Sequence, residues 1–489
     1  MTAEPRDTSA LKVRSMGDKS FVWFLLPTLL QTVFGVGVMV PVTTYYLDPA
    51  DIGTVAILTS VALLVTPLTT TGDSWVLSTH WHATSEVGRK VLVFNLLLAN
   101  FSLKAAGAGI FWVLSPWVLP HLIRDYRPEY HQYFGLALLG LLTVTFWGTL
   151  SPLMVIERAP VSHALNESLQ WAAGALTTLL GLSVAKLGIL ALFLAPLASG
   201  LASTLHGLWY AAHRISARPS WHWGMEIVRS GMPAIPFSLM DVVANSMDRF
   251  VIQRWLDLSA LGIYAHSQNY RGMFVSVTKA YSRTMTPTFL ELFAGSPAQP
   301  PRQVEATVSV WYVCVTAGGI LVSLFSPEVV HILTHGKFDR AAELVPIWFL
   351  LIFAHSMGIP YTQYLLTVRQ NVLLSWSSIV MSVGTIALIC VVTWQFGVIG
   401  ATSAAVFGAL ALHGVRMYLA RRLNCSYRIE IGMLCGIAIS LTSYVITRVI
   451  AIPLPVKAIL GVLVTGFAVQ QIMKRMSIQE IMTRLAPTK

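Results

Sequence analysis

Ionisable side chains interrupt an apolar stretch of the chain between residues 226 and 291. We expect two long helices here, joined by a tight turn at residues 256–261. An ionisable side chain at membrane depth costs roughly 2.5–3.5 kcal/mol even on the cheaper insertion scales, so it usually faces a bundle interior or a water-filled cavity. The stretch is therefore the first candidate for a functional site. Its charged and amide side chains are Asp241, Asn245, Asp248 and Arg249 on the first helix and Arg271, Lys279 and Arg283 on the second.

The spacing of these side chains predicts one polar face on each helix. At about 100° per residue, Asp241, Asn245 and Asp248 fall within roughly 60° of one another. On the second helix, an arc of roughly 120° holds a basic set with its polar neighbours. That set is Tyr264, Arg271, Lys279, Ser282 and Arg283. Two interpretations follow: the acidic and basic faces neutralise each other as buried ion pairs, or the basic face binds an anion.

Composition places these helices in a membrane. Of the 489 residues, 55% are hydrophobic and 11% are charged, whereas soluble domains carry roughly 25% charged residues. Mean hydropathy is +0.65. We therefore predict an all-α polytopic membrane protein with about fourteen transmembrane helices, or about twelve if the last two are extra. The net charge of +11 is explained by basic cytoplasmic connections and the buried basic set, so it does not indicate nucleic-acid binding.

The organisation expected from the apolar segments is two lobes and a tail. Lys and Arg concentrate in the connections on the side that holds both ends of the chain, which places both termini in the cytoplasm. The expected parts are a cytoplasmic segment at 1–19, an N-lobe of six helices at 20–212, a cytoplasmic linker at 213–226, a C-lobe of six helices at 227–420, two further helices within 428–474 and a cytoplasmic tail at 475–489. The seventh helix is expected at 227–255, and the longest outer connection at 326–342.

An internal repeat relates the two lobes. The segment LDPADIGTVA at 47–56 matches LDLSALGIYA at 256–265, and LGI at 187–189 matches FGV at 396–398 at the same offset. We interpret this as two homologous six-helix lobes in parallel orientation around a central cavity, an arrangement that secondary transporters use to hold substrate between their halves. In the first lobe, Lys104 lies near the middle of a predicted span and Asp73 near an inner helix end. Asp73 is equally consistent with an ordinary interfacial residue.

The repeat and its flanking residues resemble a known family. The segments YYLDPADIGTVAI and SGMPAIPFSLMDVVANSMDRFVIQRWLDLSALGIYAHSQNY resemble the polysaccharide transporters of the multidrug/oligosaccharidyl-lipid/polysaccharide (MOP) exporter superfamily, which are O-antigen and exopolysaccharide flippases. The matching positions are Pro233 and Pro236, Asn245-Ser-Met-Asp248-Arg249 and Leu261-Gly-Ile-Tyr264. The first helix lacks the Arg or Asp that lipid II flippases place there, which argues against that branch of the superfamily.

The resemblance implies a function and roles for these residues. Such a protein would move an undecaprenyl-diphosphate-linked oligosaccharide across the inner membrane of a bacterium, without a cofactor or an enzymatic step. The diphosphate would bind to Arg271, Lys279 and Arg283, with Lys104 behind them, because guanidinium and ammonium groups form charge-assisted hydrogen bonds with phosphate. The glycan would contact Tyr264, Gln268 and Asn269, for which ordinary packing is the alternative. The side chains expected to bind a coupling proton or sodium ion, or to gate the cavity, are Asp241, Asp248 and Asp73.

The implied partners are the lipid-linked substrate, the bilayer, the coupling ion and the polymerase and chain-length proteins of the same pathway. Two alternatives stay open at this stage. A cation or drug antiporter of the same superfamily would need acidic cavity residues, whereas this set is mainly basic. A membrane glycan polymerase or ligase would carry its catalytic groups on a large outer loop, and the longest outer connection here offers only His331, His335, Lys337 and Asp339. No HExxH, CxxC, P-loop or nucleophile-elbow motif is present, and the four cysteines show no paired motif.

Overall fold

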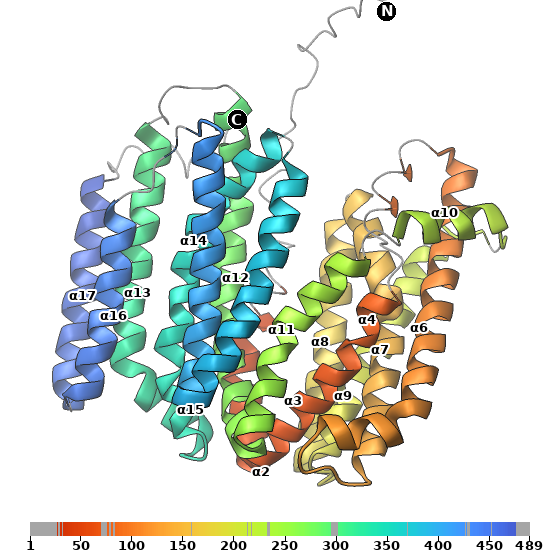
Figure 1. Cartoon of the computed structure of the whole chain (residues 1–489), viewed down its shortest axis with the longest axis horizontal. Coiled ribbons are helices and arrows are strands. Elements are labelled where there is room, and N and C mark those ends of the chain that lie inside the picture. The colour runs from red at the N-terminus through yellow and green to blue at the C-terminus, as the bar shows by residue number, and fades with distance from the viewer. Residues whose placement is uncertain are drawn as a thin grey trace, which may run out of the picture.

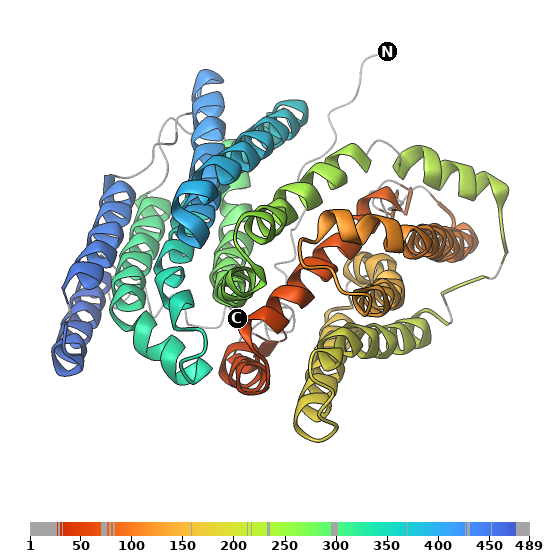
Figure 2. The same ribbon diagram turned by 60° about the horizontal axis from the view of Figure 1, so that its bottom comes forward.

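The chain folds into two groups of long helices that lie side by side (Figures 1 and 2). The computed structural model describes residues 27–475, apart from 28–29, 32, 70–75, 78–79, 82–83, 158, 213, 217, 232–234, 295–301, 369, 426, 428–430 and 451. All regular secondary structure in the described residues is helical. This confirms the predicted all-α fold class.

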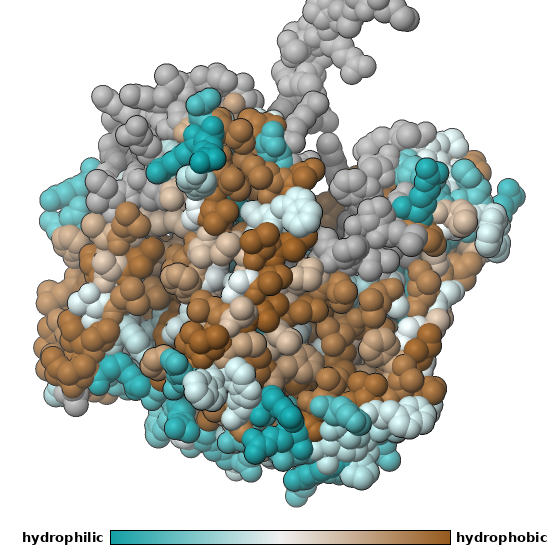
Figure 3. Space-filling model, viewed as in Figure 1, coloured by the Kyte–Doolittle hydropathy of each residue, from teal (hydrophilic) through white to brown (hydrophobic). Residues whose placement is uncertain are grey.

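A broad apolar band crosses the visible face of the helices. In Figure 3, hydrophobic atoms cover the middle of the visible face, and hydrophilic atoms gather toward its upper and lower margins. Within the described part of the chain, nine helices are long and apolar enough to cross a bilayer. The α12 and α8 helices lie outside this set because charged and polar side chains lower their hydropathy, although α12 has 37 residues. The chain is thus a multi-pass membrane protein.

The first group of helices forms the N-lobe. It packs chiefly through α7 against α9, α8 against α9 and α6 against α7. Its elements are η2 (Gly35–Met39), α2 (Val40–Tyr46), α3 (Pro49–Leu63), α4 (Val65–Leu68), α6 (Glu86–Leu122), α7 (Tyr130–Ile156), α8 (Pro160–Ser183) and α9 (Leu190–Ala211).

The second group forms the C-lobe together with the two last helices. Nearly all of α14 is buried, because α12, α13, α15 and α16 surround it. The elements are α11 (Ile235–Trp255), α12 (Leu258–Ala294), α13 (Arg302–Thr334), η4 (Asp339–Glu343), α14 (Val345–Thr367), α15 (Asn371–Arg422), α16 (Ile431–Val449) and α17 (Leu454–Arg475). The α15 helix is broken at Gly397, so it supplies two membrane passes.

Backbone geometry bears out the internal repeat. Gly188 and Gly397, which the repeat aligns, adopt φ values of +57° and +60°, in the left-handed region that glycine tolerates best. Each turns the chain between two helices of its own lobe. The matched LD segments also begin matched helices. At the start of α12, the Asp257 carboxylate accepts a 2.6 Å hydrogen bond from the backbone N–H of Ala260. At the start of α3, the Asp51 carboxylate accepts a 3.1 Å hydrogen bond from the backbone N–H of Asp48.

The lobes meet at one end of the molecule, at the bottom of Figure 1. There α3 packs against α11 and α12, and α2 packs against α13. The hydroxyl of Thr44 donates a 3.2 Å hydrogen bond to the carbonyl of Leu333, and the Lys337 ammonium lies 3.1 Å from a carboxylate oxygen of Asp48. This end is called the closed end below.

Two predicted boundaries are wrong. The seventh helix does not start at 227, because residues 221–231 form the separate helix α10 (Trp221–Gly231), which runs across the long helices in Figure 1. Its Ile227 packs into an N-lobe core cluster and its Glu226 pairs with His80 at 3.5 Å. The outer connection is also shorter than 326–342, because α13 continues to Thr334 and η4 begins at Asp339.

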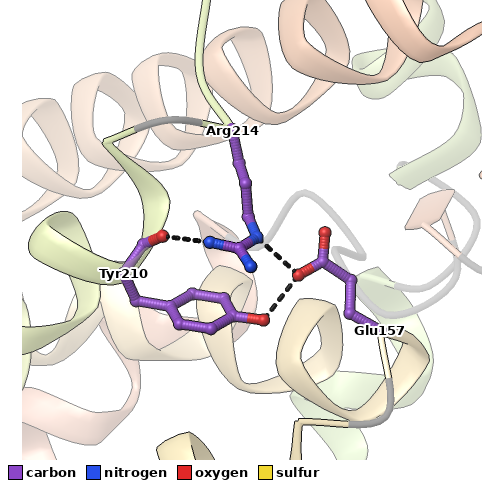
Figure 4. Close-up of polar contacts among 3 residues, drawn as sticks. All are labelled: Glu157, Tyr210 and Arg214. Carbon is purple, nitrogen blue, oxygen red and sulfur yellow. Dashed lines mark hydrogen bonds and ion pairs between the residues drawn. The ribbon is translucent and has the colours of Figure 1, made fainter.

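A compact polar cluster joins the ends of α7 and α9 just before the segment that leads to the C-lobe (Figure 4). The Glu157 carboxylate accepts hydrogen bonds from the Tyr210 hydroxyl at 2.5 Å and from Arg214 Nε at 2.8 Å. The Arg214 guanidinium also donates to the Tyr210 carbonyl and lies 4.1 Å from the centre of the Tyr210 ring. The cluster fixes where the chain leaves the N-lobe.

Candidate functional site

The acidic residue of α11 that the structure describes is buried and hydrogen-bonded. Asp248 is 4% exposed and accepts a 2.5 Å hydrogen bond from the hydroxyl of Tyr264, which is fully buried. The next residue, Arg249, reaches across to the N-lobe and donates a 2.8 Å hydrogen bond to the hydroxyl of Ser60 on α3. In this conformation Tyr264 contacts protein rather than a cavity, and the pair ties α11 to α12.

Arg271 lies in the middle of α12 and is half-buried. Its guanidinium donates a 2.8 Å hydrogen bond to Gln268 one turn earlier and lies 5.2 Å from the centre of the Trp348 ring on α14. Trp348 is itself fixed, because its indole N–H donates to the hydroxyl of Ser267 at 2.9 Å. The Nε of Arg271 is buried and has no hydrogen-bond partner among the described residues. The site therefore holds a guanidinium that no carboxylate in this part of the chain neutralises.

Lys279 is exposed and lies two turns further along α12. It lines a cavity of about 240 Å³ between α12, α14 and α15, which we call the histidine cavity after His355 and His413 in its wall. The other described side chains of the wall are neutral. A cation beside two imidazoles, with no acid among the described wall residues, suits an anionic ligand better than a cationic one.

A second cavity of about 520 Å³ lies between the lobes. Its N-lobe side includes Gln31, Thr43 and Trp171, and its C-lobe side is α12, with Asn269 and Ser276. At about 100° per residue, the α12 residues of this inter-lobe cavity and Lys279 fall within an arc of about 120°. Lys279 therefore continues the face of α12 that is presented between the lobes.

The remaining predicted residues are placed as follows. Asp73 lies outside the described residues, as do the side chains of Asp241 and Arg283 on α11 and α12. Lys104 is half-buried on α6, one turn before Gly107, which packs on α4. The structure thus brings together Arg271 with Gln268 and Asp248 with Tyr264, and it places Lys279 and Asn269 on the cavity-facing side of α12.

Sequence reasoning missed the partners that α14 and α15 supply. Arg416 of α15 donates hydrogen bonds to Ser378 at 2.8 Å and to Thr362 at 3.3 Å inside the C-lobe. His355 and His413 each lie alone in an apolar span, so the spacing of residues along the chain does not indicate that they meet. Of the two interpretations of the charged faces, neutralisation of α11 acids by α12 bases is not seen at Asp248 among the described residues, where the side-chain donor is Tyr264.

Comparison with solved structures identifies the class of protein. The lipid II flippase MurJ in an inward closed conformation superimposes with a TM-score of 0.66 at 10% identity, covering 93% of this chain and 97% of that one. An inward-facing multidrug resistance MATE family transporter of the MOP superfamily gives 0.57 at 12% identity, covering 82% and 94%. A mutant of the MATE transporter VcmN from Vibrio cholerae gives 0.56 at 11% identity, covering 85% and 98%. The fold is that of MOP-superfamily transporters.

The family follows from the sequence itself. A family model described as "Polysaccharide biosynthesis protein" matches residues 45–343. The chain belongs to this polysaccharide biosynthesis family, as the resemblance in the sequence predicted. No curated protein sequence matches it. The chain thus combines membership of a polysaccharide biosynthesis family with the fold of MOP-superfamily transporters.

Proposed function

We propose that the protein is a flippase that moves an undecaprenyl-diphosphate-linked oligosaccharide from the inner to the outer leaflet of the bacterial inner membrane, for surface polysaccharide synthesis. The observation that carries this proposal is the position of Lys279, exposed on the cavity-facing side of α12 beside a cavity whose described wall residues include no acid. A diphosphate cannot cross hydrocarbon unpaired, because an isolated charge in a low-dielectric medium is strongly disfavoured. An ammonium in a partly dry cavity compensates that charge.

The arrangement of cavities suits an amphiphilic substrate. The inter-lobe cavity offers amide and hydroxyl groups from Gln31, Thr43, Asn269 and Ser276, which suit the hydroxyls of a glycan. The phosphates would lie beside Lys279, within reach of Arg271 and Arg283 on the same helix, and of Lys104 as the N-lobe contributor. Tyr264 and Gln268 would support these contacts by positioning Asp248 and Arg271.

The cycle would proceed by alternating contact of the two lobes. In the present conformation the lobes touch at the closed end, where the predicted outer connections lie. Opening this contact and closing the opposite end would carry the cavity from one leaflet to the other. Coupling to a proton or sodium ion remains assigned to Asp241, Asp248 and Asp73, with Asp241 first because Asp248 is already hydrogen-bonded.

The alternative functions fit the site less well. A cation or drug antiporter needs an acidic cavity, and none of the described residues that line the histidine cavity or the inter-lobe cavity is acidic. A glycan polymerase or ligase needs an outer catalytic loop. The outer connection predicted at 326–342 contains only residues 335–338 and the short helix η4. Beside it, His331 pairs with Asp339 at 3.0 Å.

The test is the leaflet distribution of lipid-linked glycan in cells that express Lys279→Gln, Lys279→Arg or Arg271→Ala in place of the native chain. We expect Lys279→Gln and Arg271→Ala to leave the glycan on the cytoplasmic side, and Lys279→Arg to retain part of the transport because it keeps the charge. Lys90→Gln, at an exposed i,i+4 pair with Glu86, is the matched control. Normal surface glycan in Lys279→Gln cells at equal expression would refute the proposal.

A further inference from the structure

Two histidines from different helices meet in the wall of the histidine cavity. Nε2 of His413 on α15 lies 3.3 Å from Nδ1 of His355 on α14, and His413 is 7% exposed. The ring of His413 fits only because residue 358 is glycine: a Cβ built on Gly358 would lie 1.8 Å from His413 Nδ1. The pair is therefore built into the packing of α14 against α15.

The hydrogen bonding favours one arrangement of protons on the neutral pair. His413 Nδ1 is buried against Gly358 and has no partner among the described residues. A proton there would be a buried, unsatisfied donor, so it is better placed on Nε2, which then donates to Nδ1 of His355. His355 in turn carries its own proton on Nε2. Neutral His355 thus offers an N–H donor beyond the pair.

The charged side chains that interact with the pair are all positive among the described residues. His355 interacts electrostatically with Arg271 and Lys279 of α12 and with Arg416 of α15, and His413 interacts with Arg416 and with His355 itself. The described residues that line the cavity belong to α12, α14 or α15, and none of them is acidic. The three cations therefore disfavour a further proton on the histidines while the cavity holds no anion. The negative charge of an anion that enters the cavity favours this proton.

We propose that the histidine cavity binds the phosphate groups of the lipid-linked substrate through Lys279 and His355, and that binding adds one proton from solvent to the His355–His413 pair. This inference rests on the proposed function and deepens it, because it places the diphosphate in one cavity and links its binding to protons. His413 acts as a positioning residue that holds the His355 ring and shares the added proton.

Linkage fixes the direction of the pH effect. The complex carries one proton more than the free protein, so affinity for the diphosphate rises as the pH falls through the titration range of the pair. Full linkage to one proton changes the affinity by about tenfold per pH unit.

The experiment is isothermal titration calorimetry on the full chain in detergent, between about pH 5.5 and 8.5, in buffers with different ionisation enthalpies. The probe is a short-chain polyprenyl diphosphoryl N-acetylglucosamine, a diphosphate diester whose own charge is constant over this range. Inorganic pyrophosphate is the second probe. The variants are His355→Gln, His413→Gln, Lys279→Gln and, as a histidine control at the exposed end of α6, His121→Gln.

We expect the native chain and His121→Gln to take up about one proton on binding the lipid-linked probe, and His355→Gln and His413→Gln to lose this uptake. Lys279→Gln should bind at least about tenfold more weakly at every pH while keeping the proton uptake. If folded His355→Gln takes up as many protons as the native chain, the inference is wrong. The proposed function still stands in that case if Lys279→Gln fails to transport. Equal affinity for inorganic pyrophosphate would overturn the assignment to a lipid-linked ligand. Unchanged affinity in Lys279→Gln would count against both.

Discussion

Gly53 of α3 and Gly262 of α12 pack reciprocally across the interface between the lobes. A Cβ built on Gly53 would lie 2.0 Å from the carbonyl oxygen of Leu258, and one built on Gly262 would lie 1.7 Å from the carbonyl oxygen of Pro49. The internal repeat aligns these two glycines, so each lobe presents the same position to the first turn of the other lobe's matching helix. The closed end is thus a pseudo-symmetric contact of backbone on backbone.

The first prediction concerns this contact. Gly53→Ala and Gly262→Ala should each disfavour the conformation with the lobes touching, because a methyl group cannot fit beside a main-chain carbonyl. Overpacking costs about 1–3 kcal/mol, which would change the ratio of closed to open molecules by about 5- to 150-fold. Distances between spin labels at Asp48 and Lys337, measured by pulsed EPR in lipid nanodiscs, should lengthen. Gly109→Ala, in open space on α6, is the control.

The same experiment separates this contact from the exposed ion pair beside it. The Lys337–Asp48 pair has side chains that are 37% and 71% exposed, and such pairs contribute about 0–1 kcal/mol. For this comparison the spin labels are placed at positions next to Asp48 and Lys337. Removal of the ion pair should leave the distribution of distances between these labels nearly unchanged. A large shift on loss of the ion pair, with none in Gly262→Ala, would show that charge rather than backbone packing holds this end together.

The repeat and the hydropathy explain why much of the fold could be predicted. The repeat aligned Gly188 with Gly397, both at a positive φ that is costly for other residues, and Asp48 with Asp257, each directly before a helix. The α10 helix was missed because its apolar residues continue the hydropathy of the following span. What separates the two helices is the docking of Ile227 on the N-lobe core, which depends on a tertiary contact.

The site could be predicted only where one helix defines it. Lys279, Arg271 and Asp248 stood out because charge in an apolar helix is costly. Their partners come from other helices: the two histidines that meet are 58 positions apart, and Trp348 lies 77 positions beyond Arg271. No local periodicity connects such residues, because the contact depends on which faces of α12, α14 and α15 pack together.

The second prediction concerns the bond between Tyr264 and Asp248. Tyr264→Phe removes the hydroxyl and leaves a carboxylate that is 4% exposed without this donor, so the folded chain should lose about 1–3 kcal/mol of stability. Thermal unfolding in detergent, followed by intrinsic fluorescence, should show a clear fall in the midpoint. Tyr45→Phe, at a tyrosine 60% exposed, should not change it.

Asp248→Asn distinguishes a structural role for Asp248 from ion coupling. An asparagine oxygen still accepts the hydrogen bond from Tyr264, and the substitution also removes a buried charge. We expect this variant to fold and to transport glycan. A folded Asp248→Asn protein that fails to transport would instead assign the coupling ion to Asp248.

The third prediction concerns Arg271, which is held between Gln268 and the face of Trp348. Lysine in its place keeps the charge but loses both the planar stacking on the indole and the fixed donor geometry. We expect Arg271→Lys to weaken binding of a diphosphoryl probe by about 5- to 30-fold, on the basis of about 1–2 kcal/mol for a desolvated cation–π contact and its hydrogen bond. Trp348→Leu should produce a similar loss, and combining the two changes should add little. Additive losses would mean that Arg271 binds independently of the ring.

The last prediction concerns the docking of α17 on the C-lobe. Lys457 at the start of α17 is 8% exposed, and its ammonium lies 2.6 Å from a carboxylate oxygen of Glu328 on α13. Removing one partner of a buried pair is worse than removing both, because the remaining charge stays desolvated. Glu328 keeps about a third of its side chain in solvent, so we expect Lys457→Met to destabilise the docking of α17 only slightly. Glu328→Gln leaves the buried ammonium unpaired and should destabilise it by about 1–3 kcal/mol. The double variant should recover most of that loss of stability. Hydrogen exchange of α17, read by mass spectrometry with Lys474→Gln as the same-helix control, measures the effect. Equal protection of α17 in all four variants would show that apolar contact with α13, rather than this pair, keeps the helix in place.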